Sequence, residues 1–277
     1  MREATSISQT NMSQIDKIAI VGGGNMGGAI ARGIAKAGLA QPNQIAVSRR
    51  SPSALDAWKQ QGFAATPNNC EAVLGANIVV LAVKPYQTQE VANQVKSSIQ
   101  SGALVISIAT GVSVAQLEEW LGADKSVVRA MPNTAAEVGE SVTALVAGHN
   151  TTEAQMALAQ EVFSALGMAV VVDEAQMPAL TALASCGIAH ALRYIRAAQE
   201  SAIEMGLKAD VAAQIVSQTV KGAAQLILTN HSHPEVEIDK VCTPKGVTIA
   251  GINAMEHAGF TSAVMKGMMG SYNKIVK

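Results

Sequence analysis

The first 172 residues alternate short apolar runs with stretches of helical periodicity. Apolar runs rich in β-branched residues occur at 17–21, 45–48, 77–83, 103–108, 126–130, 142–147 and 168–172. Helical patterns lie between most of them, at 26–37, 53–61, 88–99, 114–120 and 153–166. This alternation predicts an α/β fold with a doubly wound, mostly parallel sheet of Rossmann type. The last strands lack a full crossover helix between them, so an antiparallel pair is expected there.

The pattern changes after residue 173 and becomes helical throughout. Ala-rich helical stretches cover 176–205, 209–228, 248–257 and 261–275, with glycine stops at Gly206 and Gly259. The histidine- and proline-containing stretch 231–234 interrupts them. We therefore predict a tail at 1–15, a dinucleotide-binding domain at 16–173 and an all-helical domain at 174–277.

Composition narrows the classes of partner. The 277 residues are 49% hydrophobic with a net charge of −1, and no run of Lys or Arg suggests a nucleic-acid surface. No run of about 18 apolar residues suggests a membrane span. The three cysteines lie far apart in sequence, which favours a reducing, cytoplasmic location. The histidines and cysteines show no metal-ligand spacing, so no metal is expected.

A glycine-rich turn joins the first strand to the first helix. Gly22, Gly24 and Gly27 form the pattern G-x-G-x-x-G, with Asn25 and Met26 between the last two. The first glycine permits the tight turn, the second lets the backbone approach a pyrophosphate, and the third allows close packing of helix on strand. The helix N-terminus adds free N–H groups for the phosphates. These residues predict a dinucleotide site, although such a turn also serves packing alone.

The end of the second strand indicates which dinucleotide binds. NAD-preferring sites carry a carboxylate about 20 residues after the glycines, but this chain has Ser48, Arg49 and Arg50 there. A hydroxyl and two guanidinium groups suit a 2′-phosphate, so NADP(H) is the expected cofactor and NAD(H) the less favoured one. The alternative is a solvated arginine pair at a strand end.

Two further strand ends are candidates for the same crevice. Ala82, Val83, Lys84 and Pro85 close the fourth apolar run, and ligands of such sheets bind beyond the carboxyl ends of the strands. Lys84 has either a structural role or a contact with cofactor phosphate or substrate. Asn133 follows the run at 126–130, where it either contacts nicotinamide or ribose or builds a turn with the preceding proline.

Several of these segments resemble the pyrroline-5-carboxylate reductase family. The matching segments are 22–27 (GGGNMG), 82–85 (AVKP), 131–134 (MPNT) with 138–140 (VGE), 243–251 (TPKGVTIAG) and 258–260 (AGF). The resemblance covers nearly the whole chain after residue 16. It implies reduction of 1-pyrroline-5-carboxylate to L-proline, the last step of proline synthesis. It also implies a homodimer formed through the helical domain, with a larger ring of dimers as a further expectation.

By this resemblance the substrate is bound at the start of a C-terminal helix. The corresponding residues are Lys245, Gly246, Val247 and Thr248, whose backbone N–H groups would hold the carboxylate, with the Thr248 hydroxyl near the ring nitrogen. Independently, free N–H groups at a helix start suit a small anion. Residues 243–253 contain no carboxylate or histidine, so we expect catalysis mainly by orientation. Thr248 is also a candidate helix cap, a role that is compatible with ligand binding.

Two segments depart from the family pattern. Residues 184–190 read ASCGIAH where the family usually has a stretch like SGSGPAY, and this segment, including Ser185 and Cys186, often borders the substrate. Lys245 stands where the family usually has glycine. Its ammonium group either strengthens anion binding or points into solvent.

Other functions remain open at this point. A β-hydroxyacid dehydrogenase would need a lysine in the first long helix of the second domain, and 176–205 has none. A reductase of another small imine is the closer alternative, given the changes at 184–190. An inactive NADP-binding regulatory protein is the third.

Overall fold

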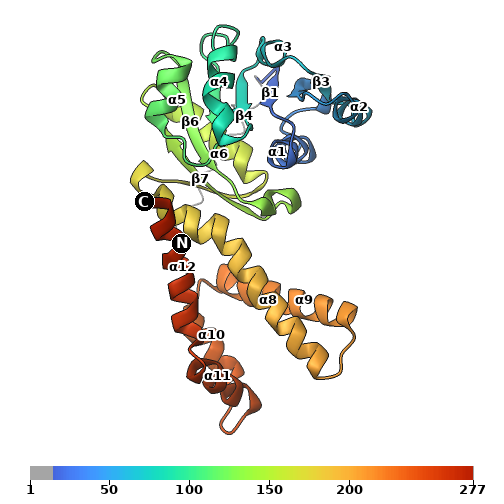
Figure 1. Ribbon diagram of the computed structural model, residues 1–277, viewed down its shortest axis with the longest axis vertical. Coiled ribbons are helices and arrows are strands. Elements are labelled where there is room, and N and C mark those ends of the chain that lie inside the picture. The colour runs from blue at the N-terminus through green and yellow to red at the C-terminus, as the bar shows by residue number, and fades with distance from the viewer. Residues whose placement is uncertain (1–14, 277) are drawn as a thin grey trace, which may run out of the picture. The chain divides into compact units, whose positions relative to one another are not determined.

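The computed structural model describes residues 15–276 of the chain. The described part forms two compact units, one ending at Ser185 and the other beginning at Cys186 (Figure 1). The first contains the sheet and the second is helical, and each is described separately below. The proposed domain boundary at 173/174 lies twelve residues before this division.

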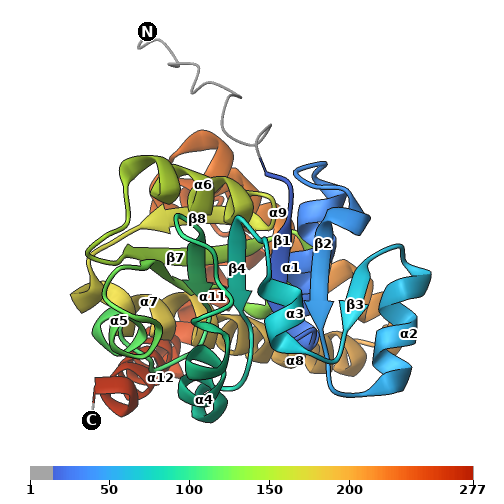
Figure 2. The same cartoon turned by 90° about the horizontal axis from the view of Figure 1, so that it is seen from above.

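The first unit is built on an eight-stranded sheet. The strands are β1 Ile18–Val21, β2 Ile45–Ser48, β3 Ala64–Thr66, β4 Ile78–Leu81, β5 Leu104–Ser107, β6 Ser126–Met131, β7 Ser141–Ala147 and β8 Gly167–Val171. Their order is β3-β2-β1-β4-β5-β6-β7-β8, and Figure 2 shows β4, β1, β2 and β3 side by side. Every neighbouring pair is parallel except β6 with β7. The predicted doubly wound fold is confirmed, and the expected antiparallel pairing is limited to one pair.

Helices cover both faces of this sheet because successive strand residues point to opposite sides. Ile18 and Ile20 pack in one core with α1 (Asn25–Lys36) and α6 (Glu153–Ser164), whereas Ala19 and Val21 pack in the other with α4 (Pro85–Val95) and α5 (Val114–Leu121). The helices of this unit are α1 Asn25–Lys36, α2 Pro52–Gln60, α3 Asn69–Val73, α4 Pro85–Val95, α5 Val114–Leu121, α6 Glu153–Ser164 and α7 Met177–Leu180. Residues buried on both sides explain why these strands are unbroken apolar runs.

The sequence pattern missed two short elements and misplaced one helix start. β3 has only three residues and α3 only five, which is too short for a periodic signal. α4 begins at Pro85, three residues before the predicted start, because proline is favoured in the first turn of a helix. Ile15, assigned to the tail, is buried in the core. The rest of the predicted tail lies outside the described residues.

The predicted continuous helix over 176–205 is wrong. A 3₁₀ turn, Glu174–Gln176, leads into α7, and a π-helical segment, Thr181–Cys186, separates α7 from α8 Gly187–Glu204. Pro178, in the first turn of α7, is compatible with a new helix start rather than a helix interior. π-helical turns have no compositional signature, and they occur frequently at functional sites.

The second unit continues with α9 Ala209–Asn230, α10 Pro234–Val241, α11 Val247–His257 and α12 Phe260–Val276. α10 was not predicted, although His233 caps it and Pro234 occupies its first turn. Between Cys186 and Val276 the buried apolar residues are Ala202 and Ala212 alone. No helix among residues 15–276 is long and apolar enough to cross a membrane.

Candidate functional site

The sheet order places the first candidate site at the carboxyl ends of β1 and β4. The chain runs from β1 outward to β2 and β3, and then returns to β4 on the other side of β1. The loops after β1 and β4 therefore diverge and leave a crevice at this topological switch point. The glycine turn and residues 82–85 follow these two strands, so the structure brings together two of the predicted cofactor segments.

Each glycine of the turn meets a different steric requirement. Gly22 has a φ of +103°, and a Cβ there would lie 2.7 Å from the Ala82 carbonyl oxygen. At Gly27 a Cβ would lie 2.2 Å from the Gly22 carbonyl oxygen. These two glycines are needed for the fold itself, because only glycine fits such close backbone contacts.

Gly24 differs from the other two because a Cβ there would meet the end of a flexible side chain and no backbone atom. It is the N-cap of α1 with an extended backbone, and a Cβ there would meet only the Arg49 guanidinium nitrogen, at 3.3 Å. Asn25 and Met26 then form the first helical positions. The backbone conformation of Gly24 does not require glycine, so its missing side chain is explained by a ligand that approaches the backbone, as a pyrophosphate would.

The last residue of β2, Ser48, and the two arginines after it have different surroundings. Ser48 is buried, and its hydroxyl accepts from the Gly22 N–H at 3.3 Å and donates to Asn69 Oδ1 at 2.7 Å. Arg49 donates to the Gly23 carbonyl at 2.7 Å, which lays its guanidinium across the glycine turn. Arg50 is exposed. Arg49 is thus a basic group that contacts the turn, while Ser48 is held by protein contacts.

Asn69 belongs to this site and was missed by the sequence reasoning. It begins α3, and its amide nitrogen donates to Gln94 Oε1 at 2.9 Å while its oxygen accepts from Ser48. The signal lay in the Asn68-Asn69 pair, in which Asn68 caps the helix with its side chain. It was overlooked because β3, which places the pair at the same sheet edge, is so short.

The loop after β4 places backbone and a lysine at the crevice. The Ala82 carbonyl faces Gly22, and the Ala82 N–H donates to the Val21 carbonyl at 2.8 Å. Val83 packs against the core formed with α4 and α5. Lys84 is the N-cap of α4, its backbone carbonyl accepts from the Thr88 hydroxyl at 3.2 Å, and its side chain is exposed. Pro85 fixes the start of the helix.

Asn133 has a structural role in this geometry. Its side-chain oxygen accepts from the Ala135 N–H at 3.0 Å and caps the 3₁₀ helix Thr134–Val138, while its amide nitrogen donates to the Ala184 carbonyl at 3.1 Å. The side chain is 4% exposed. This arrangement matches the predicted turn, and a contact with nicotinamide or ribose stays a prediction.

The C-terminal loop in the helical unit forms a tight turn. The Gly246 N–H donates to the Thr243 carbonyl at 2.8 Å, and Gly246 is the N-cap of α11. Val247 and Thr248 are the first two helical residues, so the prediction that Thr248 caps the helix is wrong. Val247 is 90% exposed and Thr248 is half-buried. The loop presents free N–H groups of a helix start, as an anion site requires.

Lys245 occupies a strained position in this turn. Its φ of +60° lies in the left-handed region, which costs a non-glycine residue about 1–2 kcal/mol. This strain explains why a glycine is usual at this position in the family that the sequence resembles. The Lys245 side chain is exposed.

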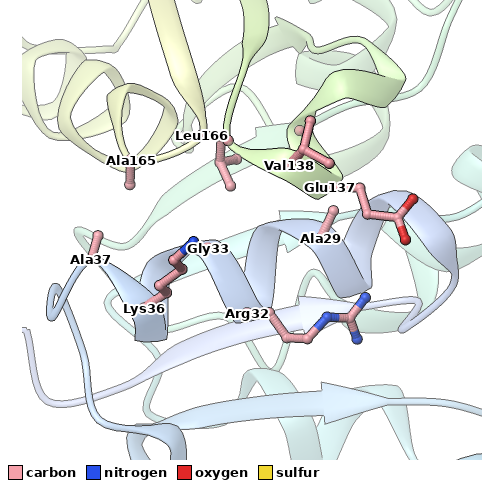
Figure 3. A pocket seen from close by; sticks show the side chains of 11 residues that line it. Ala29, Arg32, Gly33, Lys36, Ala37, Glu137, Val138, Ala165 and Leu166 are labelled. Atoms are coloured by element: carbon pink, nitrogen blue, oxygen red, sulfur yellow. The ribbon is translucent and has the colours of Figure 1, made fainter. Parts of the chain in front are cut away.

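A cavity of about 500 Å³ lies between α1 and the 3₁₀ helix Thr134–Val138 (Figure 3). Arg32 and Lys36 line it from α1, and Glu137 and Val138 line it from the other side. Arg32 also stacks on the Trp58 ring at 5.2 Å. None of the predicted cofactor or substrate residues lines this cavity, so it adds no residue to the candidate site.

Within residues 15–276, no group of three or more His, Cys, Asp or Glu residues is arranged to hold a metal ion.

Two family models match this chain, one in each half. Residues 174–277 match the family model described as pyrroline-5-carboxylate reductase dimerisation, and residues 17–111 match one described as NADP oxidoreductase, coenzyme F420-dependent. A solved pyrroline-5-carboxylate reductase from Coxiella burnetii is 34% identical with a TM-score of 0.87, covering 94% of this chain and 97% of that one. The chain belongs to the pyrroline-5-carboxylate reductase family. The resemblance inferred from the sequence is confirmed.

Two other family members extend the comparison. Pyrroline-5-carboxylate reductase 1 of Dictyostelium discoideum is 40% identical over 268 residues, which cover 93% of this chain but only 49% of that longer protein. The Plasmodium falciparum pyrroline carboxylate reductase, solved with NADP bound, is 27% identical with a TM-score of 0.84, covering 95% of this chain and 97% of that one. The family is thus one of oxidoreductases, and a member of similar fold binds NADP.

Proposed function

We propose that this protein reduces 1-pyrroline-5-carboxylate to L-proline with NADPH as hydride donor. The observation that carries the proposal is the turn 243–248, which opens α11 inside the region matching the family's dimerisation model. Exposed backbone N–H groups and a half-buried threonine hydroxyl suit a small cyclic imine with a carboxylate. In the balanced reaction a hydride adds to the imine carbon and a proton to the ring nitrogen.

The residues around the first site fit a bound NADP(H). Gly24 leaves the α1 N-terminus open to the pyrophosphate, and Arg49 lies beside it. When bound, NADPH supplies the hydride. The protein's own contribution is to position the reactants: the glycine turn would fix the cofactor, and Gly246 to Thr248 would hold the substrate carboxylate and ring nitrogen. Residues 243–253 contain no carboxylate and no histidine to act as a general acid near neutral pH, so the imine would react as its iminium.

One assay separates the candidate functions. Purified protein mixed with NADPH and pyrroline-5-carboxylate should lose NADPH absorbance and form L-proline in equal amount. Turnover of another cyclic imine, but not this one, would favour an altered substrate, for which the sequence 184–190 gives the reason. NADPH binding without turnover of either would indicate a regulatory protein.

The preference for NADPH should depend on the two arginines after β2. Replacing both Arg49 and Arg50 with alanine removes the cations near the expected 2′-phosphate, and each charge-assisted contact contributes about 1.5–3 kcal/mol. We expect the KM for NADPH to rise at least about tenfold while the KM for NADH changes little. Initial rates with each cofactor measure this.

The matched control is Lys59→Ala, which removes an exposed cation from α2. It should leave both KM values unchanged. An unaltered NADPH preference in the double variant would favour the solvated-pair interpretation, and a wild-type preference for NADH would refute the NADP(H) assignment.

A homodimer formed through the helical unit explains its exposed apolar surface. Large apolar side chains are exposed along its helices, including Leu192, Ile215, Val236, Phe260 and Met265. Two buried alanines are too little apolar burial to stabilise five helices. A second copy would cover this surface, and a ring of dimers is the larger assembly proposed.

Charges on α12 should therefore break the assembly. Met265 and Met269 lie one helical turn apart, and they are 64% and 53% exposed. The variant Met265→Glu/Met269→Glu should lower the molar mass measured by light scattering to that of a monomer, because burying carboxylates in an apolar interface is costly. Lys266→Glu, exposed on the same helix, is the control and should keep the wild-type mass. An unchanged mass in the double variant would exclude α12 from the interface.

We also propose a cytoplasmic location. The free cysteines at 70, 186 and 242 are compatible with a reducing compartment. Fractionation of the producing cells tests it.

A further inference from the structure

The hydrogen bond between Asn133 and Ala184 joins two segments that are 51 residues apart in sequence. Asn133 follows Pro132 at the carboxyl end of β6, and Ala184 lies within the π-helical segment Thr181–Cys186. The donor is the Asn133 amide nitrogen and the acceptor is the Ala184 carbonyl, at 3.1 Å. Both residues belong to the first unit.

Asn133 is a rigid anchor because three of its groups are bonded. Its backbone N–H donates to the Ser141 hydroxyl at 3.2 Å, and its side-chain oxygen accepts from the Ala135 N–H at 3.0 Å. With the amide bond to Ala184, this buried side chain is fixed from three directions. Because Asn133 is fixed at the carboxyl end of β6, its amide nitrogen holds the Ala184 carbonyl at a defined position relative to the sheet.

The π-helical segment is the part of the chain that needs such an anchor. A π turn is wider than an α turn and is rarely stable over more than one turn. Within this one, the Thr181 hydroxyl donates to the Met177 carbonyl at 2.7 Å, and the Asn133 amide bonds the Ala184 carbonyl. Two side-chain bonds therefore support a segment whose backbone pattern is irregular, and the second lies next to Ser185 and Cys186.

We propose that Asn133 is a positioning residue for the substrate-bordering segment 184–186, acting through the Ala184 carbonyl. This role rests on the proposed function, because it assumes that 185 and 186 border the imine. This role differs from a cofactor contact, because the Asn133 amide nitrogen that would bind nicotinamide already donates to the Ala184 carbonyl. Loss of the amide should then affect the imine and leave NADPH binding unchanged.

The test uses two substitutions that keep the cap and remove the donor. In Asn133→Ser the hydroxyl still caps the 3₁₀ helix but is too short to reach Ala184. In Asn133→Asp the cap acceptor is kept, and a carboxylate oxygen opposes the carbonyl. Thr151→Val is the matched control, since it removes one side-chain bond, from the Thr151 hydroxyl to the Val127 carbonyl at 2.6 Å, elsewhere in the same unit.

The expected result is selective for the imine. Both Asn133 variants should lower kcat/KM for pyrroline-5-carboxylate about ten- to a hundredfold, because a displacement of about 1 Å has effects of that size. The NADPH dissociation constant should change less than about twofold. Hydrogen exchange of peptides covering 181–190 should be faster in both variants than in Thr151→Val or the wild type.

Each contrary outcome is distinct. An unchanged kcat/KM, or a rise in the NADPH dissociation constant equal to the loss in kcat/KM, would overturn the proposal, the latter by returning Asn133 to the cofactor. If the wild type does not reduce the imine, the proposed function fails. Hydrogen exchange then tests by itself whether Asn133 fixes the π-helical segment. Unchanged exchange at 181–190 in the variants would refute that role. If Asn133→Ser does not fold, Asn133→Asp supplies the same comparisons.

Discussion

Replacing Gly24 with valine is expected to weaken NADPH binding about a hundredfold while the protein still folds. Gly24 has extended backbone angles that valine adopts readily, and its Cβ would meet only the movable end of Arg49. The folding cost is that of a poor N-cap, about 1 kcal/mol. The branched side chain would occupy the space through which a pyrophosphate reaches the first N–H groups of α1. Loss of two such bonds, at about 1.5 kcal/mol each, weakens binding about a hundredfold.

Fluorescence titration with NADPH measures this loss, and thermal unfolding reports the fold. At an NADPH concentration that raises the Tm of the wild type, the Tm of Gly24→Val should rise much less. The contrasting variant is Gly27→Ala, whose Cβ would lie 2.2 Å from the Gly22 carbonyl oxygen. It should lower the Tm without any ligand present. Wild-type NADPH affinity in Gly24→Val would mean that the glycine turn serves packing alone.

The part of the fold that the sequence predicts is the part with regular burial. β1 and β4 are buried on both faces, which makes them continuous apolar runs, and G-x-G-x-x-G sits at a strand end because steric contacts of Gly22 and Gly27 require it. Elements shorter than one period, such as β3 and α3, carry no such signal. The place of Asn69 in the site became apparent only in the structure, because β3 and α3 bring it to Ser48.

The helical unit was harder to predict in detail because its apolar residues are not in a core of this chain. Periodicity reports which side of a helix is apolar but not what covers it. The π turn at Thr181–Cys186 is equally invisible, since its determinants include Asn133, a residue 51 positions away from the carbonyl it binds. Long-range contacts of single side chains have no local pattern.

The two departures from the family pattern have different physical meanings. Lys245 keeps the left-handed conformation at φ +60° that glycine would adopt without strain, so the turn is preserved despite the substitution. Residues 184–186 lie in the π-helical segment, where a side-chain bond supports the backbone, and residues 187–190 begin α8. Any change of substrate is therefore expected from the second departure rather than the first.

Removing the Thr248 hydroxyl is expected to slow turnover about ten- to a hundredfold. General acid–base catalysis by a well-matched group contributes about a hundredfold or more, and a threonine hydroxyl is a weak acid, so the lower end of that range is expected. Thr248→Val keeps the shape of the side chain, and Thr248→Ser keeps its hydroxyl. Because Gly246 caps α11 and Thr248 is the second helical residue, the valine variant should lose little helix stability. The NADPH dissociation constant should stay within about twofold of the wild type, and single-turnover rates with saturating cofactor measure the chemical step.

The pH dependence of that loss separates two roles for the hydroxyl. If Thr248 helps to deliver a proton to the ring nitrogen, the deficit of Thr248→Val should shrink as the pH falls and the imine arrives already protonated. If the hydroxyl only orients the ring, the deficit should be the same at every pH. In either case Thr248→Ser should recover most of the rate, because the hydroxyl is retained. Wild-type turnover in Thr248→Val would refute both roles, and would leave the backbone N–H groups of Val247 and Thr248 as this turn's whole contribution to the reaction.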